Sequence, residues 1–339
     1  MLARELRLVF TQSTLVTLID LPPEFVTSVA VVLGLVLGSF LNVVIYRLPR
    51  GVSLLWPGST CPACGHKIAA YDNIPVVSWV LLLGRGRCCR VRISPRYPLV
   101  ETISGLYAWA LVYAIVADMP ADTPWWRVIL VFVMHLSLGL SLVAAAFIDL
   151  EFMILPDAIT LGLTVIGLAT ASLRVGMDYR SSLQGAVLGF LGIWLPFDVL
   201  YRRIRGKVGM GLGDAKLVML AGAWFGWQGA LFALLAGSVQ GTFAMIAVLV
   251  ARGRIDEPEA VTEERKARLE ELERASTEEE RIRLEQEIAA DPVLAQPPTA
   301  RLASAKFAFG PFLALAIIEF QLLSATGFYR VWAGDWVVL

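Results

Sequence analysis

The sequence predicts an all-α polytopic membrane protein with about eight transmembrane helices and two cytoplasmic insertions. Hydrophobic residues make up 57% of the 339 residues and charged residues 17%, whereas soluble globular domains contain about 25% charged residues. Several apolar runs reach the roughly 20 residues that a bilayer crossing requires. These runs are separated by loops in which the basic residues are unevenly distributed, and this unevenness gives the orientation.

The apolar runs give the expected crossings in chain order. We place them at residues 27–46, 98–117, 127–148, 158–174, 183–201, 215–227, 229–250 and 306–325. The sixth run is short, so it either crosses alone or joins the seventh in a broken or re-entrant unit. The expected number of crossings is therefore eight to within about one.

Basic residues predict which side of the membrane each loop faces. The connections near 118–126 and 175–182 carry Arg180 as their single basic residue. The loop after the first crossing carries eight basic residues and the loop after the fifth carries four: Arg47, Arg50, Lys67, Arg85, Arg87, Arg90, Arg92 and Arg96, then Arg202, Arg203, Arg205 and Lys207. Because Lys and Arg are enriched in cytoplasmic loops, we expect both basic loops in the cytoplasm and the N-terminus outside.

These assignments divide the chain into six parts. In order they are an N-terminal interfacial segment, the first transmembrane helix, a cysteine-containing insertion, a transmembrane core, a charged helical hairpin, and the last helix with a tail. Their bounds are 1–26, 27–47, 48–97, 98–251, 252–303 and 304–339. Within the hairpin, Ser276–Glu280 reads as a capping box at the start of its second helix. The hairpin is either a solvated spacer or an arm that docks a partner.

Two aspartates stand where apolar runs meet the same predicted membrane face. Asp149 ends the third crossing, and Asp214 precedes the sixth, directly after a glycine-rich run that includes Gly211 and Gly213. Two carboxylates in one site share a proton, so one activates water while the other hydrogen-bonds a substrate carbonyl. We expect the glycines to admit an extended substrate and to adopt unusual dihedral angles beside the acid. The pair therefore indicates an aspartic hydrolase that needs no metal for its chemistry.

Other interpretations of the polar residues stay open. The alternative to catalysis is that Asp214 caps the N-terminus of the sixth crossing and that Asp149 is an interfacial residue at a helix end. We expect Asp157, after a proline, to cap the fourth crossing, the alternative being that it replaces Asp149 in catalysis. Lys216 either pairs with a carboxylate or a lipid phosphate, or lowers the pKa of an aspartate. A proton-coupled transporter is a further possibility, although it predicts repeats and acids near mid-membrane.

Nucleotide and nucleic acid are not indicated as ligands. A phosphate-binding Walker loop requires Gly-Lys-Ser/Thr, whereas Gly213 is followed by an acid. The formal net charge of +0 likewise gives no electrostatic reason for nucleic-acid binding.

Four cysteines lie in the first insertion. Cys61 and Cys64 form a Cys-x-x-Cys knuckle of the kind that binds structural zinc, and we expect the reducing side of the membrane to keep them as thiols. Cys88 and Cys89 are adjacent, and neighbouring side chains point apart, so joint binding of one ion requires an unusual turn. The fourth ligand is then Cys88 or His66. The alternatives are reduced, partly buried thiols without metal, or thiols made reactive by nearby arginines.

Taken together, these motifs resemble the type IV prepilin peptidases, the bacterial GxGD membrane aspartyl proteases. The matching stretches follow the family order over nearly the whole chain: Gly38–Pro49, Cys61–Cys64, Tyr71–Pro75, Ile93–Glu101, Asp149–Asp157, Gly209–Lys216 and Phe309–Leu313.

The resemblance implies that Asp149 and Asp214 are the catalytic pair. It also implies prepilin and pseudopilin substrates that lie in membrane lipid, with cleavage after a leader glycine at the cytoplasmic face of the inner membrane. Many such enzymes then methylate the new N-terminus with S-adenosylmethionine through the first insertion. No fingerprint for that cofactor is visible, so a peptidase without methylation stays an alternative. The family also implies a tetrathiolate zinc site, from which this chain departs because Gly86 stands where a partner of Cys89 would align.

Overall fold

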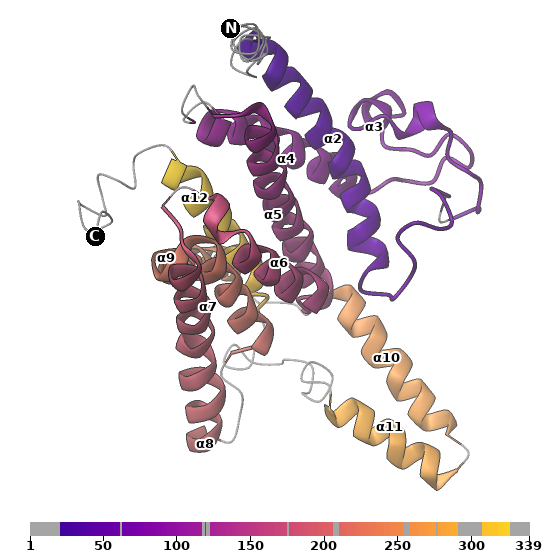
Figure 1. Cartoon of the computed structure of the whole chain (residues 1–339). Coiled ribbons are helices and arrows are strands. Elements are labelled where there is room, and N and C mark those ends of the chain that lie inside the picture. Colours follow the sequence, from indigo (N-terminus) through magenta and orange to yellow (C-terminus); the bar gives the residue numbers. More distant parts are fainter. Residues whose placement is uncertain are drawn as a thin grey trace, which may run out of the picture. The chain divides into compact units, whose positions relative to one another are not determined.

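The computed structural model describes nine stretches of the chain, and helices dominate them (Figure 1). These are residues 21–61, 63–116 with 119, 123–174, 176–205, 210–253, 258–275, 277–290 and 307–325. Within them, β-pairing is limited to two isolated bridges, Thr60 with Lys67 and Arg85 with Arg92. The all-α class is therefore confirmed. Residues 1–20 of the predicted interfacial segment lie outside the described residues.

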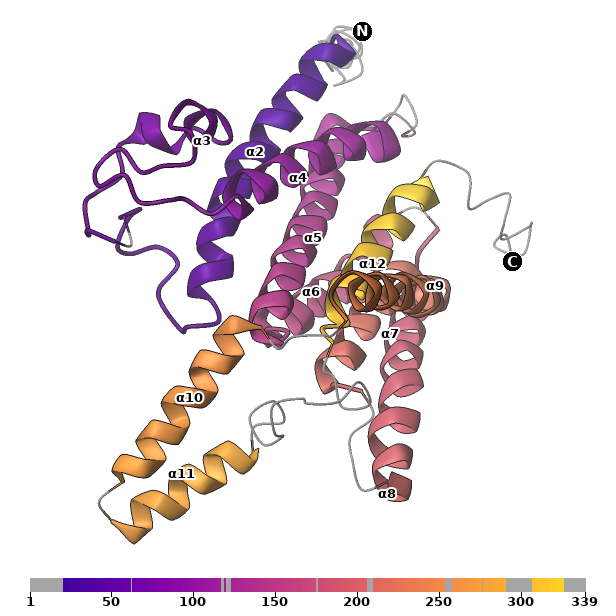
Figure 2. The same cartoon turned by 180° about the vertical axis from the view of Figure 1, so that it is seen from behind.

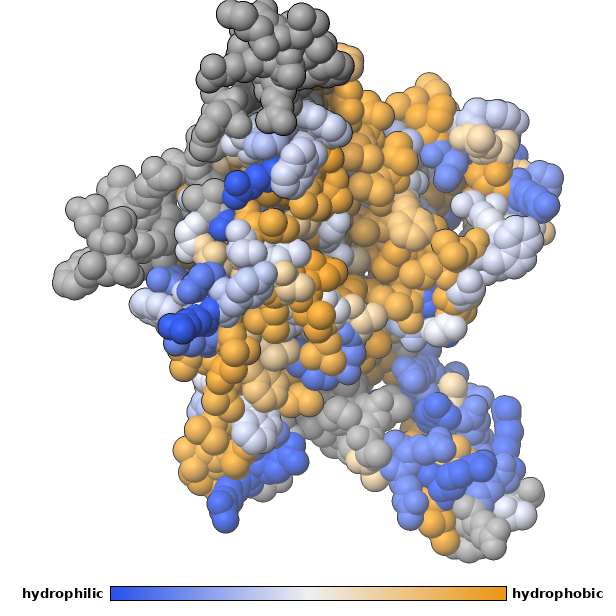
Figure 3. All heavy atoms as spheres, in the orientation of Figure 1, coloured by the Kyte–Doolittle hydropathy of each residue, from blue (hydrophilic) through white to orange (hydrophobic). Residues whose placement is uncertain are grey.

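Five helices in the described residues are long and apolar enough to cross a membrane. They are α2 (Pro23–Arg47), α4 (Arg96–Leu111) with the π-helical η3 (Val112–Val116), α5 (Trp125–Phe152), α7 (Tyr179–Ile193) with η5 (Trp194–Leu200) and α8 (Tyr201–Arg205), and α9 (Leu212–Arg252). Two shorter apolar helices are α6 (Asp157–Ala169) and α12 (Gly310–Ala325). Each predicted crossing overlaps one of these helices. Hydrophobic residues accordingly cover much of the surface in view (Figure 3).

Helix α9 is broken at Gly226, which has φ 70° and ψ −170°. Glycine adopts this left-handed conformation without the steric cost that a Cβ would impose. The break separates the predicted sixth and seventh crossings, and it leaves the last carbonyl groups of the first half without partners in their own helix. The Arg174 guanidinium donates to the carbonyls of Ala223 and Trp224, and the Ser182 hydroxyl donates to that of Ala223 at 2.6 Å. Side chains from outside α9 therefore supply the hydrogen bonds that these carbonyl groups lack within their own helix.

Internal packing divides the chain into two compact units. The first comprises residues up to 44, then 53–141 and 319 onward, and the second comprises 45–52 and 142–318. In the first, a Cβ built on Gly34 of α2 would lie 2.5 Å from the Ser104 carbonyl oxygen of α4. In the second, a Cβ on Gly222 of α9 would lie 2.0 Å from the Gly185 carbonyl oxygen of α7. Small residues therefore allow close helix contact in both units.

The two insertions differ in kind. Residues 48–95 contain the short η2 (Ala70–Asn73) and α3 (Val77–Leu81), and three of their described residues are buried: Cys61, Ser78 and Gly84. Helices α10 (Glu259–Arg274) and α11 (Glu278–Ala290) lie side by side as a hairpin (Figures 1 and 2), joined by an Arg268–Glu287 ion pair at 3.8 Å. Hydrophilic residues make up most of the hairpin surface in view (Figure 3). Its second helix is capped by Thr277, whose hydroxyl accepts the Glu280 N–H, while Ser276 lies outside the described residues.

Candidate active site and cysteine cluster

Asp149 lies in the last turn of α5, where its side chain is only 6% exposed. Its Oδ2 accepts a hydrogen bond of 3.0 Å from the backbone N–H of Gly310, the first residue of α12. Free N–H groups and the helix dipole make a helix N-terminus favourable for a negative charge. Sequence reasoning gave Gly310 no role of its own, although a proline in the following position is a helix-start signal.

Asp214 lies in the first turn of α9, whose N-cap is Gly211. Asp214 is therefore the third residue of the helix and not the N-cap residue, and its carboxylate accepts a hydrogen bond from the backbone of Gly211, as the third helical residue of a capping box does. Its partly buried carboxylate lies against the backbone amide of Gly211, and a Cβ built on Gly211 would be 3.3 Å from Oδ2.

The second unit brings these two aspartates to one site. Asp149 lies close enough to Asp214 for the two carboxylates to repel each other when both are ionised. The Leu155 side chain, on the loop after Asp149, contacts the backbone at two glycines: a Cβ on Gly213 would lie 3.1 Å from Leu155 Cβ, and one on Gly310 would lie 3.2 Å from its Cδ1. The ends of α5, α9 and α12 therefore meet around the two carboxylates.

The glycines beside Asp214 act through their small size. Gly211 has φ −65° and ψ 144°, which most residues adopt, and Gly213 lies within the helix. The expectation of unusual dihedral angles is wrong at these two positions, because the described backbone needs none there. Gly213 instead leaves room for Leu155. Gly209 lies outside the described residues.

Lys216 and Asp157 form an ion pair, with Lys216 Nζ 2.5 Å from Asp157 Oδ1. Of the partners considered for Lys216, a carboxylate and a lipid phosphate, the structure therefore shows the carboxylate. Asp157 is the first residue of α6, its N-cap is Pro156, and no side chain caps the helix. The capping prediction for Asp157 is wrong because its carboxylate, in a side chain that is 59% exposed, is bound by Lys216 instead.

The four cysteines form one group in the first unit. Their Sγ atoms all lie within 4.8 Å of one another, and the pairs Cys61–Cys89, Cys64–Cys88 and Cys88–Cys89 are 3.6, 3.4 and 3.8 Å apart. A tetrahedral ion with sulfur ligands at about 2.3 Å requires sulfur–sulfur separations of about 3.8 Å. The cluster therefore has the dimensions of a tetrathiolate metal site, and His66 is not part of it.

Two tight turns build this cluster. In the first, the Cys61 N–H donates to the His66 carbonyl at 2.8 Å. In the second, Arg90 adopts φ 58° and donates to the Gly86 carbonyl at 2.9 Å. This left-handed residue is the unusual turn that lets the neighbouring Cys88 and Cys89 approach one centre.

The electrostatics of the cluster favour one thiolate. Hydrogen bonds from the backbone of Ala63 and Cys64 lower the pKa of the Cys61 thiol to about 6. Hydrogen bonding to Cys64, followed by burial, raises the pKa of Cys88 to about 12. Metal ligation requires deprotonated cysteines, so a bound cation would stabilise the thiolates that the cluster holds less readily alone.

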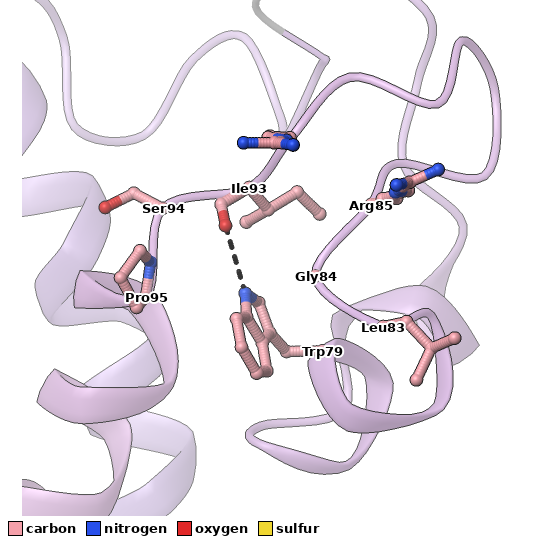
Figure 4. Close-up of a pocket in the computed structure, with 8 residues that line it drawn as sticks. Trp79, Leu83, Gly84, Arg85, Ile93, Ser94 and Pro95 are labelled. Atoms are coloured by element: carbon pink, nitrogen blue, oxygen red, sulfur yellow. Dashed lines mark hydrogen bonds between the residues drawn. The ribbon is translucent and has the colours of Figure 1, made fainter.

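A cavity of about 510 Å³ lies in the same insertion. The Trp79 ring stands between the Leu83–Gly84 turn and the Ile93–Pro95 segment, with its N–H bonded to the Ile93 carbonyl at 3.2 Å (Figure 4). Arg85 and Arg92 also line the cavity and face each other across a β-bridge. Neither has an acidic partner among the described residues. Both side chains are exposed, and an anionic group bound between them would be attracted to both.

The fold and the site define a multi-pass helical membrane protein with a pair of neighbouring aspartates at its helix ends. Comparison with known proteins adds the family. Residues 32–115 match the bacterial peptidase A24 N-terminal domain, and residues 136–246 match the type IV leader peptidase family. The chain belongs to the type IV leader peptidase family.

Several curated relatives support this membership. The prepilin leader peptidase/N-methyltransferase of Pseudomonas putida is 37% identical over 265 residues, which cover 72% of this chain and 87% of the relative. The protein of the same name from Aeromonas hydrophila is 37% identical over 254 residues, 68% of this chain and 83% of the relative. That from Myxococcus xanthus is 41% identical over 224 residues, 66% and 63%. No solved structure matches the chain significantly.

Proposed function

We propose that this protein is a membrane aspartic endopeptidase that removes the leader peptides of prepilins and pseudopilins and then methylates the new N-terminus. The observation that carries the peptidase is the meeting of Asp149 and Asp214 at the ends of α5 and α9 in a member of this family. The loop basicity supports a cytoplasmic position of this site at the inner membrane. The relatives named above support the second activity.

The two carboxylates act as one unit in this proposal. Asp149, whose carboxylate accepts the Gly310 N–H, takes a proton from the attacking water. Asp214 holds the shared proton, hydrogen-bonds the scissile carbonyl oxygen and then protonates the leaving amine. Asp157 is engaged by Lys216, which argues against its replacing Asp149.

Cleavage of a purified prepilin by the protein in lipid vesicles tests this mechanism. Asp149→Asn and Asp214→Asn should each abolish cleavage while the protein still inserts and keeps its thermal midpoint. Asp198→Asn, at an aspartate within η5 that pairs with Arg202, is the matched control and should cleave normally. Full cleavage by both site variants would remove the pair from the mechanism. Proton uptake by vesicles, with cleavage absent from the wild type, would favour the transporter instead.

We further propose that the four cysteines hold a structural zinc ion. The sulfur separations and the near absence of buried residues in the described insertion support this, because a segment without a core depends on a metal to fold. Metal analysis of the purified protein should find one zinc ion per chain. Cys61→Ser should lose it, whereas His66→Ala should keep it.

The methyl donor in this proposal is S-adenosylmethionine, which supplies a methyl group for transfer to an amine. The cavity at Trp79 fits its chemistry: Arg85 and Arg92 suit a carboxylate, and an indole face suits an adenine or a sulfonium. Calorimetric binding of S-adenosylhomocysteine should weaken at least about tenfold in Arg85→Gln/Arg92→Gln. Unchanged binding would place the donor elsewhere, and mass spectrometry of the processed pilin checks the methylation itself.

A further inference from the structure

We propose that Leu155 is a positioning residue that sets the separation of the two aspartates, and that this spacer is why Gly213 must be glycine. The proposal rests on the peptidase function above and concerns the same site. In this proposal Leu155 acts through the backbone segments that carry or bind the two acids.

The first step is the contact with α9. A Cβ built on Gly213 would lie 3.1 Å from Leu155 Cβ and 3.2 Å from its Cδ1. Both distances are tighter than ordinary van der Waals contact. Gly213 is directly next to Asp214, so the Leu155 side chain fixes how close the start of α9 comes to the loop after α5.

The second step is the contact with α12. A Cβ on Gly310 would lie 3.2 Å from Leu155 Cδ1, and the N–H of that glycine donates to Asp149. The same side chain therefore touches the residue beside one acid and the residue that hydrogen-bonds the other. A shorter or longer side chain at this position would change the distances from this loop to the start of α9 and to the start of α12 together.

The third step is that the loop holds Leu155 firmly. Met153 ends α5 with φ 55°, and its N–H donates to the Asp149 carbonyl at 2.9 Å. Pro156 follows and restricts the backbone of the residue before it. Beyond it, Asp157 is tied to Lys216 of α9. A left-handed methionine costs about 1–2 kcal/mol relative to its usual conformation, so the surrounding contacts over-determine this loop.

The test is a set of double variants assayed for prepilin cleavage in vesicles. Gly213→Ala should lower kcat by about 10- to 100-fold, because the methyl group displaces Leu155 and with it the acids. Leu155→Gly/Gly213→Ala should recover to the level of Leu155→Gly alone, because glycine also removes the Leu155 Cβ that makes the closest contact and alanine is otherwise favourable inside a helix. Leu155→Met should retain more activity than Leu155→Ala, with KM unchanged in both.

Gly310→Ala is the matched control. Its Cβ would lie 2.6 Å from Asp149 Oδ2, a much closer contact than the 3.2 Å to Leu155 Cδ1, so that the main clash stays when Leu155 is shortened. Leu155→Ala should therefore not rescue Gly310→Ala. Thermal midpoints identify any variant that fails to fold, and the activity of such a variant is not compared.

Three results would overturn the proposal that Leu155 sets the separation of the two aspartates. The first is a double variant as inactive as Gly213→Ala, which would mean that the glycine serves the substrate and not Leu155. The second is a Leu155→Ala variant with raised KM and unchanged kcat, which would make Leu155 a substrate contact. The third is a fully active Gly213→Ala. An inactive wild type would instead contradict the proposed function.

Discussion

The aspartate site and the cysteine cluster are assembled in opposite ways. Asp149 and Asp214 lie at the ends of long helices, and their surroundings are fixed by glycine contacts and by a helix N-terminus. The cysteines lie on turns, in an insertion whose described residues bury only Cys61, Ser78 and Gly84. Both sites join parts of the chain that are distant in sequence, but only the first is surrounded by a packed core.

The difference teaches where each site obtains its rigidity. Helix packing preorganises the acids before any ligand arrives, as catalytic groups require. Small segments without a core depend on a metal for their geometry. Changes at one site should therefore affect it alone, and the following predictions test that separation from the largest expected effect to the smallest.

Loss of either acid should separate the two sites most clearly. Asp214→Asn should lower the cleavage rate about 10³-fold or more, within the range that general acid–base groups contribute. Zinc content and methylation of an already cleaved pilin should stay at wild-type levels. Mass spectrometry and metal analysis of one preparation give all three values. A parallel loss of metal would show that the sites are not independent.

Loss of the metal should produce the opposite pattern. Cys61→Ser, or chelation of the wild type, should lower methylation at least about tenfold and cleavage by less. The expected cause is unfolding of the insertion, which limited proteolysis would reveal as new cuts within residues 48–95. Equal losses of methylation and cleavage would contradict the independence of the two sites.

Removal of the buried guanidinium should weaken the second unit. Arg174 is 7% exposed and donates to carbonyls of Gly167, Ala223 and Trp224. Arg174→Gln should cost about 2–3 kcal/mol of unfolding free energy, since hydrogen bonds from charged groups contribute most. Ser182→Ala, which removes one neutral donor to Ala223, should cost about 1 kcal/mol. Denaturation in mixed micelles would rank the two variants, and neither should change zinc content.

The smallest effect is expected at an exposed ion pair in the insertion. Arg87 donates to both carboxylate oxygens of Asp72 at 2.8–3.0 Å, and these hydrogen bonds hold the pKa of Asp72 below its usual value. The stabilisation is therefore present above the unfolded-state pKa and lost as the pH falls through the folded one. The protection of the insertion's amides, taken relative to their intrinsic exchange rate at each pH, should fall on acidification, and Arg87→Gln should remove that dependence. An equally pH-dependent variant would assign the effect to other groups.

The sequence predicts the helices well and the contacts between them poorly. Apolar length places each predicted crossing on a described helix, because a membrane helix satisfies its own backbone and needs little from its neighbours. Asp149 and Asp214 were found by their position at the ends of such runs. Leu155 was not identified from the sequence, because one apolar residue among many does not stand out until the residues that it contacts are known.

Other features depended on tertiary structure in the same way. The Cys88–Cys89 turn requires a left-handed Arg90, which no sequence preference indicates. Arg174 was placed at the end of the fourth crossing, yet α6 ends at Ala169 and the arginine binds carbonyls of two helices. The carbonyls of Ala223 and Trp224 become available because Gly226 interrupts α9, and that of Gly167 because α6 ends at Ala169.

The position of Arg174 also constrains biogenesis. The carbonyls that receive its guanidinium belong to Gly167, synthesised just before it, and to Ala223 and Trp224, synthesised some fifty residues later. Until that later segment leaves the ribosome, the charge has too few acceptors to be withdrawn from water. We expect α6 to remain at the lipid–water boundary during translation and to settle only when α9 arrives, so that the insertion machinery releases these helices as a group.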